Sequence, residues 1–120
     1  MEDVLLLHAD QVDLYGGDHG VRDPGLLESA VVQAKASFGG EYLHTDIFEM
    51  AAAYLYHIVQ NHPFVDGNKR TGLIAALTFL DMNGIEIEAP KGTLYDLTMS
   101  VATGNAEKAE IAAFFRGLVE

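Results

Sequence analysis

Residues 62–70 read His-Pro-Phe-Val-Asp-Gly-Asn-Lys-Arg and join two segments whose apolar residues have helical spacing. A histidine can accept a proton near neutral pH, and a carboxylate four residues later offers the hard oxygen that magnesium prefers. Gly67 permits a positive φ, and a glycine turn that opens a helix presents free N–H groups to an anion such as phosphate. Two adjacent cations, Lys69 and Arg70, follow at once. A base, a metal ligand, a phosphate cradle and two cations in this order indicate transfer of a phosphorus group.

Each of these residues also has a purely structural interpretation. A histidine at a helix end is often only a hydrogen-bonded structural group, and Asp66 suits a turn or a helix cap. Lys69 and Arg70 would then be an exposed pair in the first turn of a helix, where the helix dipole disfavours cations. An anion held between these cations and the backbone N–H groups explains their position better. We therefore interpret the stretch as a site that handles phosphate.

Composition limits the classes to which this chain can belong. Its 120 residues are 49% hydrophobic, which is enough for the core of a single domain spanning residues 1–120. No apolar run approaches the roughly 20 residues that cross a bilayer, so we expect no membrane segment. The formal charge of −11 argues against direct nucleic acid binding, and without cysteine no disulfide can form. The acidic start, Met1-Glu2-Asp3, is unlike a signal peptide, and we expect a cytoplasmic protein.

Hydrophobic periodicity and turn residues predict an all-α fold. The predicted helices cover residues 4–15, 23–37, 46–61, 68–82, 93–102 and 106–118. A loop or short hairpin is expected at 39–45, and the alternation of Ile85-Glu86-Ile87-Glu88 predicts a short strand. Helix 46–61, with Thr45 or Asp46 as its cap, is apolar nearly all round, which predicts a buried central helix. The expected architecture is a compact helical bundle in which the motif loop (residues 62–67) joins two central helices.

Other histidines and tyrosines have weaker claims to a functional role. We expect a surface or capping role for His8 and for His19. Tyr42 and His44 lie in the 39–45 loop, and two readings stay open for them: contact with a partner, or packing on the surface.

The stretch resembles the motif of the Fic/Doc (Fido) family, HPFx(D/E)GN followed by Gly-Arg and a second Arg three positions later. Lys69 stands where most Fic enzymes have Gly, and Leu73 stands where they have the second Arg. Both features are typical of the Doc (death on curing) branch, the toxins of Phd–Doc type toxin–antitoxin pairs. Similar segments cover almost the whole chain: Tyr15-Gly16-Gly17, Asp23-Pro24-Gly25, Asp46-Ile47-Phe48-Glu49, Asn83-Gly84 and Ala102-Thr103-Gly104.

The resemblance implies that the chain uses ATP and Mg²⁺, and it gives each motif residue a role. His62 would be the catalytic base, and Asp66 would hold the magnesium ion. The residues expected to bind ATP and its phosphates are Phe64, Gly67, Asn68, Lys69 and Arg70. Among these, Phe64 is expected chiefly as an apolar anchor of the loop, and Gly67 would act through its backbone N–H.

Two reactions are compatible with the resemblance. Most Fic enzymes transfer the AMP part of ATP to a protein hydroxyl, whereas Doc proteins resemble kinases that bind ATP in reverse and transfer the γ-phosphate. Leu73 cannot make the arginine contact of the AMP-transferring enzymes, so we favour the kinase. The resemblance implies a threonine of translation elongation factor Tu as the target, a block of protein synthesis, and an antitoxin of the Phd type as partner. AMP transfer and a degenerate, non-catalytic binding module are the alternatives.

Overall fold

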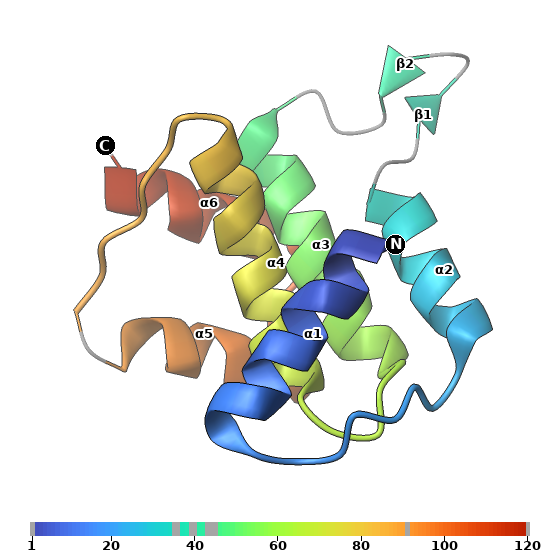
Figure 1. The fold of residues 1–120 in the computed structure, drawn as a ribbon. Coiled ribbons are helices and arrows are strands. Elements are labelled where there is room, and N and C mark those ends of the chain that lie inside the picture. The colour runs from blue at the N-terminus through green and yellow to red at the C-terminus, as the bar shows by residue number, and fades with distance from the viewer. Residues whose placement is uncertain (1, 35–36, 39–40, 43–45, 91, 120) are drawn as a thin grey trace.

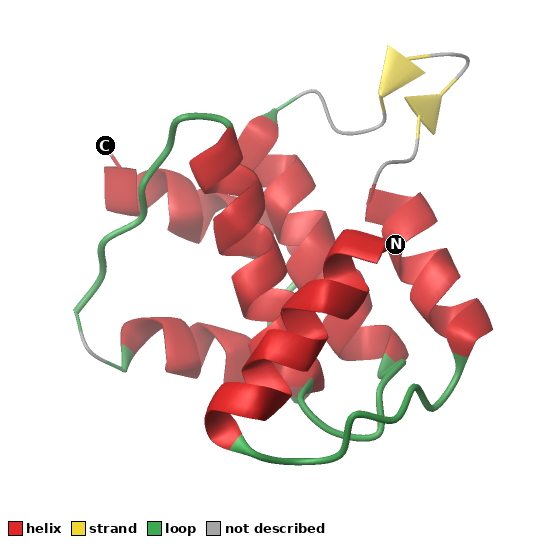
Figure 2. Cartoon of the chain, in the orientation of Figure 1, coloured by secondary structure: helices red, strands yellow, loops and turns green. Residues whose placement is uncertain are grey.

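The structure, a computed structural model, describes residues 2–34, 37–38, 41–42, 46–90 and 92–119. The described residues form six helices: α1 Glu2–Tyr15, α2 Pro24–Ala34, α3 Ile47–Asn61, α4 Asn68–Met82, α5 Thr93–Ala102 and α6 Lys108–Val119. Two short strands, β1 Ser37–Phe38 and β2 Glu41–Tyr42, pair antiparallel between α2 and α3. Figures 1 and 2 show this pair at the edge of the helical bundle. The predicted all-α fold is confirmed.

Helix α3 is the centre of the bundle, as its apolar sequence predicts. It packs against α2, α4, α5 and α6, and Figure 1 shows it surrounded by the other helices. One core cluster joins α3 to α4, α5 and α6, and a second joins it to α1, α2 and the motif loop. Leu55 belongs to the first and Ile58 to the second, and both side chains are fully buried. The helix that leads into the motif loop is therefore fixed on several sides.

Helices α3 and α4 approach each other closely at Gly72. A Cβ atom at Gly72 would lie 2.9 Å from Cγ2 of Val59 and 3.3 Å from the backbone oxygen of Leu55. Only a residue without a side chain lets the two helices meet at this distance. The motif loop is thus anchored at both ends by one tightly packed helix pair.

Asp46 caps α3 and connects it to the last helix. One carboxylate oxygen accepts the Phe48 N–H at 2.6 Å, and the other accepts Nη2 of Arg116 at 2.6 Å. Burial alone would raise the pKa of Asp46, but the hydrogen bonds and the charge of Arg116 hold that pKa below its ordinary value. Asp46 is confirmed as the cap of α3. The alternative, Thr45, lies outside the described residues.

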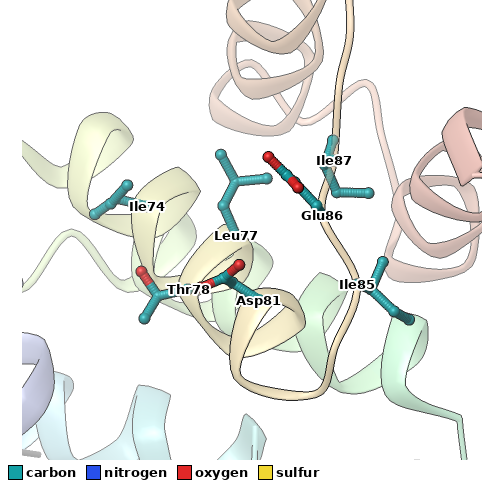
Figure 3. A pocket seen from close by; sticks show the side chains of 7 residues that line it. All are labelled: Ile74, Leu77, Thr78, Asp81, Ile85, Glu86 and Ile87. Carbon is teal, nitrogen blue, oxygen red and sulfur yellow. The ribbon is translucent and has the colours of Figure 1, made fainter.

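The predicted strand at 85–88 is wrong. Residues 85–90 run beside α4 without regular secondary structure, because no second strand pairs with them in the described part of the chain. Ile85 and Ile87 pack towards the core while Glu86 and Glu88 are turned to solvent, which explains the alternation. Figure 3 shows this segment facing α4 across a groove of about 250 Å³.

Other boundaries differ from the prediction by a few residues. Helix α2 ends at Ala34 rather than near residue 37, and Ser37 belongs to β1. The paired strands β1 and β2 agree with a short hairpin, but the side chain of Tyr42 and the whole of His44 lie outside the described residues. None of the helices in the described ranges is long and apolar enough to cross a membrane.

Candidate active site

The motif loop begins where α3 stops, at His62. This residue adopts the left-handed conformation, with φ 50° and ψ 53°, and its N–H donates to the Ile58 carbonyl at 3.2 Å. Pro63 disfavours helical geometry at the residue before it, so the predicted end of the helix is confirmed. The imidazole of His62 is exposed and has no hydrogen-bond partner among the described residues. It is therefore available to a substrate.

The loop is closed by a side chain that sequence reasoning assigned to phosphate binding. Oδ1 of Asn68 accepts the Phe64 N–H at 2.9 Å, and Nδ2 of Asn68 donates to the Phe64 carbonyl at 2.9 Å. Both residues are buried. Because the side-chain amide is engaged inside the loop, Asn68 can offer an anion its backbone N–H.

Phe64 anchors the loop in the core. Its side chain is fully buried, and its ring lies 3.7 Å from the ring of His8 with an interplanar angle of 5°. This burial agrees with the expected apolar anchor. It also keeps the aromatic ring of Phe64 away from the surface, where a nucleotide would contact the loop.

A second segment, the supporting loop (residues 16–23), holds the motif loop from outside. Nε of Arg22 donates to the His62 carbonyl at 2.7 Å, and the Arg22 N–H donates to the Pro63 carbonyl at 2.7 Å. Farther along, the Val65 N–H donates to the Gly20 carbonyl at 2.9 Å. These bonds fix the backbone on both sides of Phe64, and no local pattern in the sequence predicts them.

Asp66 and Arg70 come together at the supporting loop. Oδ2 of Asp66 accepts the Asp18 N–H at 3.0 Å, and Nη2 of Arg70 donates to the Gly16 carbonyl at 3.1 Å. A Cβ atom at Gly17, whose φ is 120°, would lie 3.2 Å from Cβ of Asp66 and 3.7 Å from Nη2 of Arg70. The double glycine therefore lets the backbone pass close to a carboxylate and a guanidinium at once.

The start of α4 presents a row of free backbone donors. Gly67 has φ 80°, and the first helical hydrogen bond runs from the Thr71 N–H to the Gly67 carbonyl. Within the described residues, the N–H groups of residues 66–70 have no hydrogen-bond partner. Free N–H groups at the positive end of a helix dipole form an anion-binding nest. Lys69 and Arg70 add two positive charges beside this nest.

This geometry agrees with what the comparison with known proteins finds. The sequence model of the Fic/DOC family matches residues 1–80, which include the supporting loop, the motif loop and most of α4. The chain belongs to the Fic/Doc family. It is 38% identical over 118 residues to "Protein kinase doc" of Escherichia phage P1, covering 98% of this chain and 91% of that protein. It is 40% identical over 105 residues to "Toxin Doc" of Mycolicibacterium smegmatis, covering 86% of this chain and 81% of that toxin.

Asp66 of this Fic/Doc chain could bind magnesium together with the phosphates of a nucleotide. Asp66 is exposed, and one of its oxygens already accepts the Asp18 N–H. No group of three or more His, Cys, Asp or Glu residues that could hold a metal occurs in the described part of the chain. Magnesium is commonly held by one or two carboxylates together with substrate phosphates. Asp66 therefore fits an ion that it shares with ATP.

The prediction for His8 is wrong, and its correction adds a residue to the site. His8 is buried on α1, and its Nε2 lies 2.7 Å from the backbone oxygen of Asp66. In a continued helix the Arg70 N–H would donate to the same oxygen. Among the described residues that bond is not made, and Nε2 of His8 donates to the oxygen instead. His19, in contrast, is exposed and paired with Asp13 at 3.1 Å, which confirms its predicted surface role.

The sequence contained a signal for the burial of His8. Val4, His8 and Val12 follow one another at intervals of four, which places them on one face of a helix. All three are buried in α1. A histidine that shares a helix face with two apolar residues is therefore expected in the interior of the Fic/Doc fold. The surface role was predicted because His8 was considered without its neighbours on that face.

We predict that the hydrogen bond of His8 supports phosphate binding. His8→Phe keeps a ring against Phe64 but leaves the Asp66 carbonyl without its donor, whereas His8→Gln keeps a donor. Freed from His8, the carbonyl can accept the Arg70 N–H and remove one donor from the nest. The affinity for Mg-ATP should fall about tenfold in the Phe variant and less in the Gln variant, as measured by titration calorimetry. Equal affinities in all three proteins would assign His8 to packing alone.

Proposed function

We propose that this protein is a Doc-type toxin that uses Mg-ATP to phosphorylate a hydroxyl side chain of a translation factor, and so blocks protein synthesis. Elongation factor Tu is the target that the family resemblance favours. The observation that carries the proposal is the motif loop. At one end stands His62, which is exposed and has no hydrogen-bond partner among the described residues, and at the other end α4 begins with N–H groups that the described residues leave unpaired. The names of the two relatives, a protein kinase and a toxin, support the same activity.

In the proposed reaction, His62 accepts the proton of the acceptor hydroxyl as its oxygen attacks the γ-phosphorus of ATP. The bond between the γ-phosphorus and the bridging oxygen breaks, and ADP leaves. The nest at residues 66–70, together with Lys69 and Arg70, binds the transferred group and stabilises its charge. Asp66 would hold Mg²⁺, which supplies further neutralisation of the phosphates when bound. Asn68 and Phe64 contribute by keeping the loop in this shape.

Leu73 favours phosphate transfer over AMP transfer. It lies one turn beyond Arg70 on α4, half-buried, and it packs against the core cluster shared by α3, α4, α5 and α6. An apolar side chain cannot hold the phosphates that a second arginine holds in AMP-transferring enzymes of the family. AMP transfer stays the second candidate, because the rest of the motif is compatible with it.

The mass of the modified target tests the proposal. Incubation with ATP and elongation factor Tu should add about 80 Da, one phosphate, to the target and release ADP. A gain of about 329 Da with release of pyrophosphate would show AMP transfer instead. In Leu73→Arg, we expect AMP transfer to rise relative to phosphate transfer. No modification of any protein in a cell extract, by a folded protein that binds ATP, would favour a binding module without catalysis.

The proposal includes an antitoxin of the Phd type. Two of the similar proteins carry Doc names, one of them expressly as a toxin, and such toxins are paired with a neutralising partner. The strongly acidic chain, with a formal charge of −11, suits a partner segment that carries basic residues.

A further inference from the structure

The guanidinium of Arg70 is held in place by the end of α1. Nη2 of Arg70 donates to the Gly16 carbonyl at 3.1 Å, and Cζ of Arg70 lies 5.5 Å from the centre of the Tyr15 ring. Tyr15 is the last residue of α1, and Gly16 follows it with φ 85°. Figure 1 shows this end of α1 at the same side of the bundle as the motif loop. A cation near the C-terminal end of a helix is also favoured by the helix dipole.

The same guanidinium lies close to Asp66 but does not pair with it. A Cβ atom at Gly17 would lie 3.6 Å from Oδ2 of Asp66 and 3.7 Å from Nη2 of Arg70. Among the described residues, however, no ion pair joins Arg70 to Asp66, and Oδ2 of Asp66 accepts the Asp18 N–H. Oδ1 of Asp66 accepts no hydrogen bond from that part of the chain. The carboxylate proposed to hold magnesium is therefore not neutralised by the arginine beside it.

Two competing contacts of similar strength decide where the guanidinium lies. An exposed cation–π contact changes an equilibrium about twofold to fivefold, and an exposed ion pair changes it by about the same factor or less. Asp66 is exposed, and so is Tyr15, at 68%. The Tyr15 ring and the Gly16 carbonyl together can therefore outweigh the attraction of the carboxylate. Without the ring, the two positions of the guanidinium would be closer in free energy.

We infer that Tyr15 is a positioning residue: its ring holds the guanidinium of Arg70 beside the anion nest and away from the Asp66 carboxylate. The arginine then stays available to the phosphates, and the carboxylate stays available to the cation that accompanies them. The inference rests on the proposed function, to which it adds a residue of α1. In this role Tyr15 acts through Arg70 and takes no part in the chemical step itself.

The test measures ATP affinity with magnesium and with a chelator in variants of Tyr15. Calorimetry is done on the wild type, Tyr15→Ala, Tyr15→Leu and Tyr15→Phe, with Mg-ATP and with ATP in excess chelator. The leucine variant keeps an apolar side chain without a π-face, and the phenylalanine variant keeps the ring without the hydroxyl. Leu14→Ala removes the neighbouring side chain of α1, which is 71% exposed, and serves as the control. Because both positions are exposed, the variants should stay folded, which thermal denaturation checks.

We expect Tyr15→Ala and Tyr15→Leu to bind Mg-ATP about fivefold more weakly than the wild type, and metal-free ATP only about twofold more weakly. The loss is larger with magnesium because the released arginine pairs with Asp66 and competes with the cation. Tyr15→Phe and Leu14→Ala should bind both forms of ATP like the wild type. In a protein that already carries Arg70→Ala, the further change Tyr15→Ala should alter neither affinity.

Several results would overturn the inference and leave the proposed function standing. Unchanged Mg-ATP affinity in Tyr15→Ala is one of them, and an equal loss with and without magnesium is another. Wild-type affinity in Tyr15→Leu would show that apolar bulk suffices, and a full loss on adding Tyr15→Ala to Arg70→Ala would show that Tyr15 does not act through the arginine. A wild type that binds neither form of ATP would instead contradict the proposed function itself.

Discussion

Replacement of His62 should abolish phosphate transfer and leave the rest of the protein intact. General base catalysis contributes about 10²- to 10⁴-fold to such a reaction, so a loss of this size is expected. The side chain is exposed and has no hydrogen bond with the described residues, so Mg-ATP affinity should hardly change. The transfer rate to the target, measured alongside calorimetric ATP affinity, separates the two effects.

The backbone at His62 decides which variant to use. With φ at 50°, alanine would be strained, whereas asparagine tolerates the left-handed region and cannot act as a base in this role. His62→Asn should therefore lose transfer as fully as His62→Ala, with less loss of thermal stability. His19→Ala removes another exposed histidine and serves as the control. Substantial transfer by either His62 variant at neutral pH would remove this residue from the mechanism.

Replacement of Asp66 should remove most of the metal-dependent binding of ATP. Asp66→Asn keeps an oxygen that can accept the Asp18 N–H, so the contact with the supporting loop survives. It loses the negative charge that a hard cation needs, and a neutral amide is a poorer ligand for magnesium. Calorimetry with Mg-ATP should show affinity lower by roughly tenfold to a hundredfold.

The metal dependence distinguishes a ligand from a turn residue. In the presence of a chelator, the wild type and Asp66→Asn should bind ATP equally weakly, because the carboxylate then has no cation to hold. Asp13→Asn, which also removes one exposed carboxylate, should bind Mg-ATP like the wild type. If Asp66→Asn matches the wild type in magnesium as well, Asp66 is a residue of the turn and nothing more.

The two helices around the motif loop could be predicted almost to the residue, because their signals are local. Pro63 stops α3 at the position before it, and Gly67 supplies the positive φ from which α4 starts. The spacing of apolar residues before Pro63 and after Gly67 predicts the buried faces of both helices. The strand wrongly predicted at residues 85–88 shows the limit of such signals, since one-sided burial of an extended chain gives the same alternation as pairing.

The support of the site could not be predicted, because its contacts connect distant parts of the chain. Arg22 bonds to a carbonyl 40 residues away, and His8 bonds to one 58 residues away. Hydrophobic periodicity is a local pattern and does not predict hydrogen bonds between residues so far apart in the sequence. The role of the Asn68 side chain could not be predicted for another reason. Its amide has the right chemistry for phosphate, and only the structure shows that the amide bonds to the backbone of Phe64.

The supporting loop also determines when the site can exist during folding. Its bonds to residues 62–65 close only after the intervening segment, which includes α2 and α3, has been made and folded back. Contacts of such long sequence separation form late, since the entropy of closing the chain must be overcome first. A nascent chain that has not yet reached α4 therefore carries no assembled catalytic centre.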